Sequence, residues 1–295
     1  MKKDEKKKKK KRSPVLYIAI VIMLISGGAL GYYGYEYFLY WQDGRAAQGQ
    51  TDVVREMFQE QMDEINLLVS ILPQTTSDAA EAEPVIMTIP FDTSPLDNAR
   101  ELTNNPDIVG FLFVEGTNIS NVILQGRDNH FYLHRDMFGR HNVNGSVFMD
   151  FRNSPDFTDP NTILYGHNMN NGTMFHDVRH YMRREFFEAH PYIKVITDDQ
   201  LFIYEIFSAF STRVDRAYRM DFDYIQVLFE DEEEFRDLLN EMMRRSVYDT
   251  GVTARWNDRI LVLSTCTNVN RNTRYVVAAR LAAEFIIDNE LGETQ

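Results

Sequence analysis

Near its C-terminus the chain reads Leu261-Val-Leu-Ser-Thr-Cys266-Thr-Asn-Val-Asn-Arg-Asn-Thr-Arg274-Tyr-Val-Val277, and this stretch holds the only cysteine among the 295 residues. The aliphatic run 260–263 predicts a buried strand that brings Cys266 to its end. The polar segment 267–273 predicts a loop, and Arg274 then opens a second strand. A hairpin of this kind would bring a thiol close to a guanidinium, which suits a nucleophile beside an anion-stabilising group.

The charge of the chain is unevenly distributed. Residues 1–12 carry nine basic and two acidic side chains, a net charge of +7, which leaves a net charge of −20 on the rest of the chain. An acidic body of this kind argues against binding to a nucleic-acid backbone, because such binding rests on basic contacts. With 44% hydrophobic and 13% aromatic residues, the chain has ample core material for one main domain with extensions.

An apolar segment follows the basic one, since residues 13–35 contain no charged side chain. As a helix, residues 15–35 would be about 31 Å long, which matches one hydrocarbon core. The preceding lysines predict a cytoplasmic N-terminus and a body on the outer side. The alternative is a cleaved signal peptide, but the apolar run is longer than a usual signal core and no small-x-small cleavage site follows it. We therefore predict an uncleaved transmembrane anchor.

The single cysteine cannot form an internal disulfide. In an exported protein it is buried and inert, paired between chains, or a functional thiol. A functional thiol needs a base, and His167 is the candidate that stands out among seven histidines. It directly follows a short predicted strand and Gly166, which places it on a loop at a strand end. A motif this short would by itself mark a structural or surface histidine more often than a catalytic one.

His176 and His180 raise a different possibility. They lie four positions apart on a predicted helix, a spacing that also suits metal ligation. No glutamate completes an HExxH pattern there, and the lone cysteine is far away in sequence. We therefore predict no metal.

The remaining body predicts short strands and a few helices. We expect helices over 51–72 (capped by Thr51 or Asp52), 94–103 (with Ser94 as N-cap), 174–187 and 231–245, and a flexible linker over 73–84. Strands are expected over 111–114, 119–124, 146–149, 162–164, 192–196 and 201–210, before the closing hairpin. Many short strands with few inserted helices predict a mixed but mainly antiparallel closed barrel.

Cys266, His167 and Arg274 form a complete set for thiol chemistry. A thiolate is the attacking species, and a nearby imidazolium or guanidinium stabilises it. Arg274 stays protonated, so it can act only electrostatically, on a substrate carbonyl or a tetrahedral oxyanion. His167 would protonate a departing amine and later deprotonate the incoming nucleophile.

Several stretches, in this order along the chain, resemble the sortase family and within it class B. They are Asp107-Ile-Val-Gly-Phe-Leu, Gln125-Gly-Arg-Asp-Asn-His-Phe-Tyr-Leu133, Gly145-Ser-Val-Phe-Met-Asp150, Asn161-Thr-Ile-Leu-Tyr-Gly-His-Asn-Met169, Leu263-Ser-Thr-Cys266 and Arg274-Tyr-Val-Val277. The resemblance covers about residues 95–285. Two positions depart from the family pattern: Val262 replaces the first Thr of Thr-Leu-x-Thr-Cys, and Val122-Ile-Leu replaces the Pro-Val before Gln-Gly. Both changes are apolar and compatible with strands, so they bear on the binding groove rather than on the reaction.

The resemblance implies a mainly β fold. It is a closed eight-stranded β-barrel with N-terminal helices and a helix inserted before the strand of Cys266, in addition to the one N-terminal transmembrane helix. The domain boundaries that we expect are a cytoplasmic basic segment (1–12), the transmembrane anchor (13–41), a juxtamembrane helix and linker (42–90) and the sortase catalytic domain (91–295).

The resemblance also implies a function at a Gram-positive cell surface. Cys266 would attack a Thr carbonyl in the C-terminal sorting signal of an exported protein, and an amine of a peptidoglycan precursor or a pilin would resolve the thioacyl enzyme. His167 is then the general acid and base, and Arg274 holds the substrate or the oxyanion. Family analogy implies that the signal binds along Asn129 and Leu133, with Ser264 and Thr265 beside the nucleophile. No cofactor or metal is expected.

Two rival functions stay open at this point. One is a thiol peptidase that hydrolyses the same acyl intermediate, because water and amine compete for one thioester. The other is a membrane-tethered binding module without turnover. The sequence identifies neither the sorting signal (NPxTN-like, LPxTG-like or a variant) nor the amine acceptor.

Overall fold

The computed structural model describes residues 14–70, 83–214, 220–266 and 273–288. The chain separates into two compact units, Met1–Asp43 and Gly44–Gln295. The basic segment 1–12, most of the expected linker 73–84 and nearly all of the expected loop 267–273 lie outside the described residues.

Helix α1 (Pro14–Met57) contains the apolar segment. From Tyr17 onward it is long and apolar enough to cross a membrane, by length and composition. Its large apolar side chains are exposed, with Leu30 at 77%. A continuous apolar surface of this kind is a mark of a membrane or protein contact.

The expected helix start at Thr51 or Asp52 was wrong, because α1 runs through both residues to Met57. Residues 42–50 contain no proline, and although Gly44 and Gly49 each weaken a helix by about 1 kcal/mol, a helix that has already formed can continue through them. Helix α2 (Gln59–Ser70) follows after a break at Phe58.

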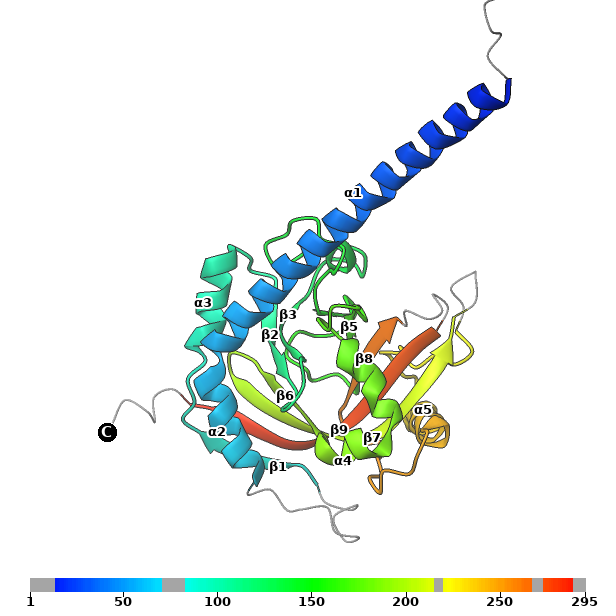
Figure 1. The fold of residues 1–295 in the computed structure, drawn as a ribbon. Helices are drawn as coiled ribbons and strands as arrows, with labels where there is room; N and C mark the ends of the chain where they lie inside the picture. The colour runs from blue at the N-terminus through cyan, green and yellow to red at the C-terminus, as the bar shows by residue number, and fades with distance from the viewer. Residues whose placement is uncertain (1–13, 71–82, 215–219, 267–272, 289–295) are drawn as a thin grey trace, which may run out of the picture. The chain divides into compact units, whose positions relative to one another are not determined.

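Eight strands close into a barrel, in the order β9-β7-β6-β2-β3-β4-β5-β8, with β8 pairing back onto β9 (Figure 1). Most neighbours are antiparallel, whereas β3–β4 and β5–β8 are parallel. This confirms the predicted closed and mainly antiparallel barrel. The strands are β2 (Ile108–Phe113), β3 (Ser120–Leu124), β4 (Phe148–Met149), β5 (Asn161–Gly166), β6 (Tyr192–Ile196), β7 (Gln200–Arg213), β8 (Ile260–Cys266) and β9 (Thr273–Ile287).

Strand β1 (Val85–Ile89) was not predicted. It lies outside the closed ring and pairs in parallel with the end of β9, from Ala283 to Ile287. Strand β8 covers the same edge of β9 only as far as Arg280. β1 therefore supplies hydrogen-bond partners to the part of β9 that extends beyond the ring.

The other expected helices lie in their expected places, but their caps and helix types differ from the expected ones. Helix α3 (Ser94–Thr103) has the expected bounds, but its N-cap is Thr93 rather than Ser94. The single helix expected over 174–187 is a 3₁₀ helix, η3 (His176–Met182), followed by α4 (Arg184–Ala189). A short 3₁₀ helix, η2 (Tyr132–His134), follows β3.

Helix α5 (Glu232–Arg245) lies where a helix was expected and packs beside β7 (Figure 1). Its apolar side chains Phe235, Leu238, Leu239 and Met242 are buried in one cluster with Ile163 of β5, Val262 of β8, and Val276 and Ala278 of β9. Burial of apolar area at about 25 cal/mol per Å² stabilises this contact. The helix thus packs on one face of the three neighbouring strands β5, β8 and β9.

Candidate active site

The three residues predicted to carry the chemistry lie at one level across neighbouring strands. Cys266 of β8 is the register partner of Arg274 of β9. Gly166, the last residue of β5, pairs with Thr265, so His167 follows at the level of Cys266. We call this level the catalytic rung. The structure therefore brings together segments that are far apart in the sequence, in the order His167, Cys266, Arg274.

The backbone around His167 is fixed by a buried aromatic ring. Phe175 is fully buried, and its N–H donates to the carbonyl oxygen of His167 at 2.9 Å. A Cβ at Gly166 would lie 2.7 Å from the Phe175 ring, so only glycine allows this packing. The glycine before the histidine is thus required by close packing.

The ring of His167 is oriented by a backbone carbonyl. Its Nε2 lies 2.9 Å from the carbonyl oxygen of Leu133. A carbonyl can only accept, so Nε2 carries a proton and donates it. Nδ1 is therefore the ring nitrogen left to exchange a proton with a reacting group.

Burial lowers the pKa of His167 below its ordinary value, and the nearby His134 and Arg274 lower it further, while the bond to Leu133 partly offsets this. The His134 ring centroid lies 6.2 Å from that of His167. A buried imidazole beside a guanidinium disfavours a second positive charge. His167 is therefore neutral at neutral pH and takes up a proton only when a negative charge forms beside it.

A second level of paired residues lies two residues before Cys266 on β8. Tyr165 and Val276 are the register partners of Ser264 on its two neighbouring strands. The Ser264 hydroxyl lies 2.7 Å from the Tyr224 hydroxyl. Burial raises the pKa of Tyr224, while Ser264 and the charge of Arg274 act in the opposite direction. Arg274 thus acts electrostatically on both His167 and Tyr224.

The four residues expected to bind a signal differ in what they can contact. Ser264 and Thr265 are each 1% exposed, so a ligand could reach their side chains only if the site opened. Leu133 is partly buried against the core and contributes its carbonyl to His167. Asn129 is half-buried, and its amide group bonds to Asp150 and to the backbone N–H of Phe151.

Sequence reasoning missed several residues around the rung. Asp150 and Tyr165 lie inside the quoted motifs, but nothing in a motif indicates that their side chains bond to each other. Tyr224 lies in a segment without any motif. Its bond to Ser264 depends on how the chain before α5 folds back onto β8.

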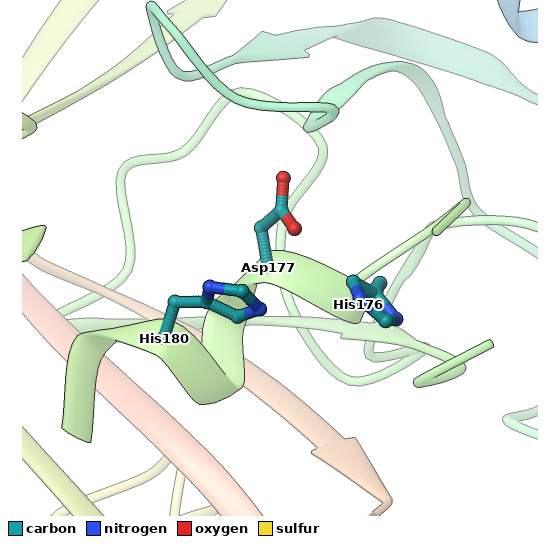
Figure 2. A group of neighbouring side chains, drawn as sticks. All are labelled: His176, Asp177 and His180. Carbon is teal, nitrogen blue, oxygen red and sulfur yellow. The ribbon is translucent and has the colours of Figure 1, made fainter. Parts of the chain in front are cut away.

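His176, Asp177 and His180 are the described residues that could hold a metal ion, since their ligand atoms lie within 4.8 Å of one another (Figure 2). Nδ1 of His176 donates to the Met169 carbonyl, so its Nε2 accepts from Arg179 at 2.9 Å. Nδ1 of His180 likewise lies 2.9 Å from a guanidinium nitrogen, that of Arg183. A cation would have to displace two positively charged donors, which argues against a metal here.

Comparisons with known proteins agree with this geometry. The family model described as Sortase domain matches residues 112–282. Sortase B of Listeria monocytogenes is 39% identical over 171 residues, which are 58% of this chain and 67% of that protein. Sortase B of Staphylococcus aureus is 36% identical over 179 residues, covering 60% of this chain and 71% of that protein.

Solved structures lead to the same family. The Staphylococcus aureus sortase B-substrate complex is similar to this chain with a TM-score of 0.65 and 28% identity, over 81% of this chain and 98% of that one. The barrel, the order of its motifs and the matched length therefore lead to one conclusion. The chain belongs to the sortase family, in its class B, whose members are cysteine transpeptidases of cell-wall sorting.

Proposed function

We propose that the chain is a membrane-anchored transpeptidase in which Cys266 is the nucleophile, His167 the general acid and base, and Arg274 the group that stabilises the oxyanion. The substrate is the C-terminal sorting signal of an exported protein. The acceptor is an amine of a peptidoglycan precursor or a pilin.

In the first half of the reaction, neutral His167 takes the proton of the Cys266 thiol at Nδ1, and the resulting thiolate attacks a backbone carbonyl of the signal. The C–S bond forms, and Arg274 stabilises the negative charge on the carbonyl oxygen. The C–N bond then breaks, and His167 gives its Nδ1 proton to the departing amine. A thioacyl enzyme and a neutral imidazole remain.

In the second half, the acceptor amine attacks the thioester. His167 removes the proton of that amine at Nδ1, and the new C–N bond forms as the C–S bond breaks. The leaving thiolate then takes the Nδ1 proton back, which restores the thiol and the neutral imidazole, so the cycle balances in protons and charge.

One observation carries this proposal, the common level of the three residues on the sheet. Register pairs place Cys266 opposite Arg274, and Gly166 beside Thr265, directly before His167. Neighbours at one level of a sheet lie about 5 Å apart, which is within reach of long side chains. The lowered pKa of His167 adds to this, since it keeps the imidazole near neutral pH in the neutral form that can accept a proton.

The apolar part of α1 would hold this site at the outer face of the membrane, where exported substrates emerge. Support for the anchor comes from the length and composition of the helix. The lysines at positions 2–11 favour a cytoplasmic N-terminus.

The test is product analysis with the full-length protein in detergent. Peptides of the NPxTN and LPxTG types are incubated with and without a short glycine peptide as amine, and the products are identified by mass spectrometry. We expect an amine adduct that replaces the hydrolysis product as the amine concentration rises. Hydrolysis alone at saturating amine would favour the thiol peptidase.

Three variants test the individual roles. Cys266→Ala should abolish both products, and His167→Asn should reduce turnover severely. Arg274→Gln should lower kcat by about 10²–10³, as does the loss of one oxyanion donor elsewhere. An unchanged rate for Cys266→Ala would contradict the role of Cys266 as nucleophile, whereas wild-type protein that binds the peptides but forms neither product would favour a binding module.

A further inference from the structure

Asp150, directly after β4, is a fully buried carboxylate that the proposed chemistry does not use. Its Oδ2 accepts from Asn129 Nδ2 at 3.0 Å, from the Tyr165 hydroxyl at 2.9 Å and from Arg152 Nη2 at 2.8 Å. Its Oδ1 accepts from the backbone N–H and from Nε of Arg152, at 3.0 and 2.8 Å. A buried charge is tolerated only with bonds of this number and quality.

The carboxylate remains ionised in this environment. Burial by itself would raise the pKa of Asp150, but the bonds from Arg152, Tyr165 and Asn129 outweigh it and hold the pKa below its ordinary value. Asp150 therefore accepts from all of its donors throughout the neutral range.

The first segment that Asp150 holds is residues 129–133, which we call the Leu133 segment. Asn129 donates to Asp150 with its amide nitrogen and accepts from the N–H of Phe151 with its amide oxygen, at 3.0 Å each. Both of its polar groups are thus directed at the turn that follows β4. The Leu133 segment ends at the carbonyl that orients His167.

The second segment is residues 224–226, which we call the Tyr224 segment. Arg152 Nη2, which binds Asp150, also donates to the carbonyl oxygen of Ile225 at 2.9 Å. The hydroxyl of Tyr224 in turn meets Ser264, two residues before Cys266. One guanidinium therefore links the carboxylate to the Tyr224 segment.

The third contact reaches the strand of the general base. Tyr165 donates its hydroxyl to Asp150 and lies two residues before His167 in β5. In register it is the neighbour of Ser264. Asp150 therefore bonds to the strand of His167 directly, to the Leu133 segment through Asn129 and to the Tyr224 segment through Arg152.

We propose that Asp150 is a positioning residue that couples the Leu133 segment to the Tyr224 segment and so fixes their spacing on the two sides of the catalytic rung. The inference rests on the proposed function, because the spacing matters for a peptide bound beside Cys266. If Asp150 only stabilised the fold, cutting its bonds would lower stability without selective loss of signal binding.

The test is a double-mutant cycle that leaves Asp150 in place. Asn129→Ala cuts the link to the Leu133 segment, and Arg152→Gln cuts the link to the Tyr224 segment. Steady-state kinetics on a turned-over signal peptide give KM and kcat for the full-length protein in detergent. We expect each single variant to raise KM about tenfold, as the loss of one charge-assisted hydrogen bond would.

The increases in KM caused by Asn129→Ala and by Arg152→Gln should not multiply in the double variant. Once one link is cut, the spacing is already lost, so the double variant should resemble either single variant. Effects that multiply to within about twofold would overturn the coupling. Asp150→Asn should reproduce the raised KM, and within that background Asn129→Ala should have little further effect.

Asn161 gives a matched control. It is buried and also holds the Tyr224 segment, through the carbonyls of Tyr224 and Gln226 at 3.1 and 2.8 Å, and neither of these bonds involves Asp150. The effect of Asn161→Ala should therefore multiply with that of Asn129→Ala. If it failed to multiply, the non-additivity would come from general loosening of the fold rather than from Asp150.

Alkylation of Cys266 by iodoacetamide separates this proposal from the proposed function. The small reagent does not depend on the spacing of the two segments, so its rate should stay within about twofold in all variants. A wild-type protein whose Cys266 is alkylated but which never turns over a signal peptide would contradict the proposed function. Normal wild-type turnover with multiplying single effects would contradict only the role of Asp150.

Discussion

Two features of its surroundings determine how His167 can exchange protons: a hydrogen bond that fixes its tautomer and an environment that lowers its pKa. The Leu133 carbonyl occupies Nε2, and burial with the neighbouring positive charges lowers the pKa of the ring. A neutral imidazole with a free Nδ1 is suited to take a proton from a thiol or an ammonium group. It is poorly suited to remain charged, so each protonation is tied to a step that creates negative charge nearby.

The effect of Arg274 on the pKa of His167 can be measured. The positive guanidinium disfavours imidazolium, so removing it should raise the pKa of His167. Burial is the larger cause, so in Arg274→Gln the pKa should move towards its ordinary value of about 6.5 without exceeding it. NMR titration of the imidazole in a Cys266→Ala background gives the value without interference from the thiol.

Arg213→Gln is the control, since it removes an exposed arginine at the end of β7. It should leave the His167 titration unchanged. A fall in the pKa of His167 on loss of Arg274 would mean that the two groups do not interact as like charges.

At the residue scale, the sequence could indicate the groups proposed to react but not the groups that hold them. Cys266 is unique in the chain, and His167 follows a recognisable strand end, so both can be found by inspection. Asp150 is one of many acidic residues, and its importance comes from burial among partners that only the folded chain brings together. A tertiary contact of this kind leaves no local pattern.

At the scale of elements, α5 is the helix that the sequence describes most completely. Acidic residues occupy its first turn, arginines occupy its last turn, and the N-cap Asp231 accepts from the backbone N–H of Glu234 at 2.9 Å. All three features satisfy free helix ends or the helix dipole. They are local, which is why they can be read before the fold is known.

The cap leads to a stability prediction. Asp231→Ala should lower the free energy of unfolding by about 1 kcal/mol, since it leaves a first-turn N–H without its side-chain acceptor. Urea denaturation followed by circular dichroism measures the change. Asp237→Ala, an exposed position in the middle of the same helix, should cost much less. Equal losses for the two variants would indicate a general charge effect rather than capping.

Strand β1 and the break between α1 and α2 are the features that local reasoning could not place. Val85–Ile89 is mostly apolar and rich in β-branched residues, but five such residues after a proline do not identify a partner. The strand forms because the end of β9 offers a free edge, and that edge depends on where β8 begins. The break at Phe58 depends likewise on packing, since that ring stacks on Phe111 of β2 at 4.0 Å between centroids.

At the scale of the whole molecule, the closed barrel follows from the number and spacing of strands together with the family resemblance. The register between β5 and β8, in contrast, cannot be predicted from the number and spacing of the strands. A shift of one residue between β5 and β8 would move His167 away from the level of Cys266 and turn alternate side chains to the other face. Burial of Ile163, Val262 and Ala278 under α5 excludes that shift, and this packing is a property of the assembled sheet.

The orientation in the membrane gives the final prediction, and the single cysteine makes it measurable. If α1 spans the membrane with the lysines that precede it on the cytoplasmic side, Cys266 lies outside the cell. A membrane-impermeant thiol reagent added to intact cells should then label the protein, and Cys266→Ser should abolish the label, because no other thiol exists in the chain. Labelling that occurs only after lysis would contradict the outward orientation. Charge decides the topology, so replacing the lysines at positions 2–11 by glutamine should reduce the labelled fraction in intact cells but not in lysates.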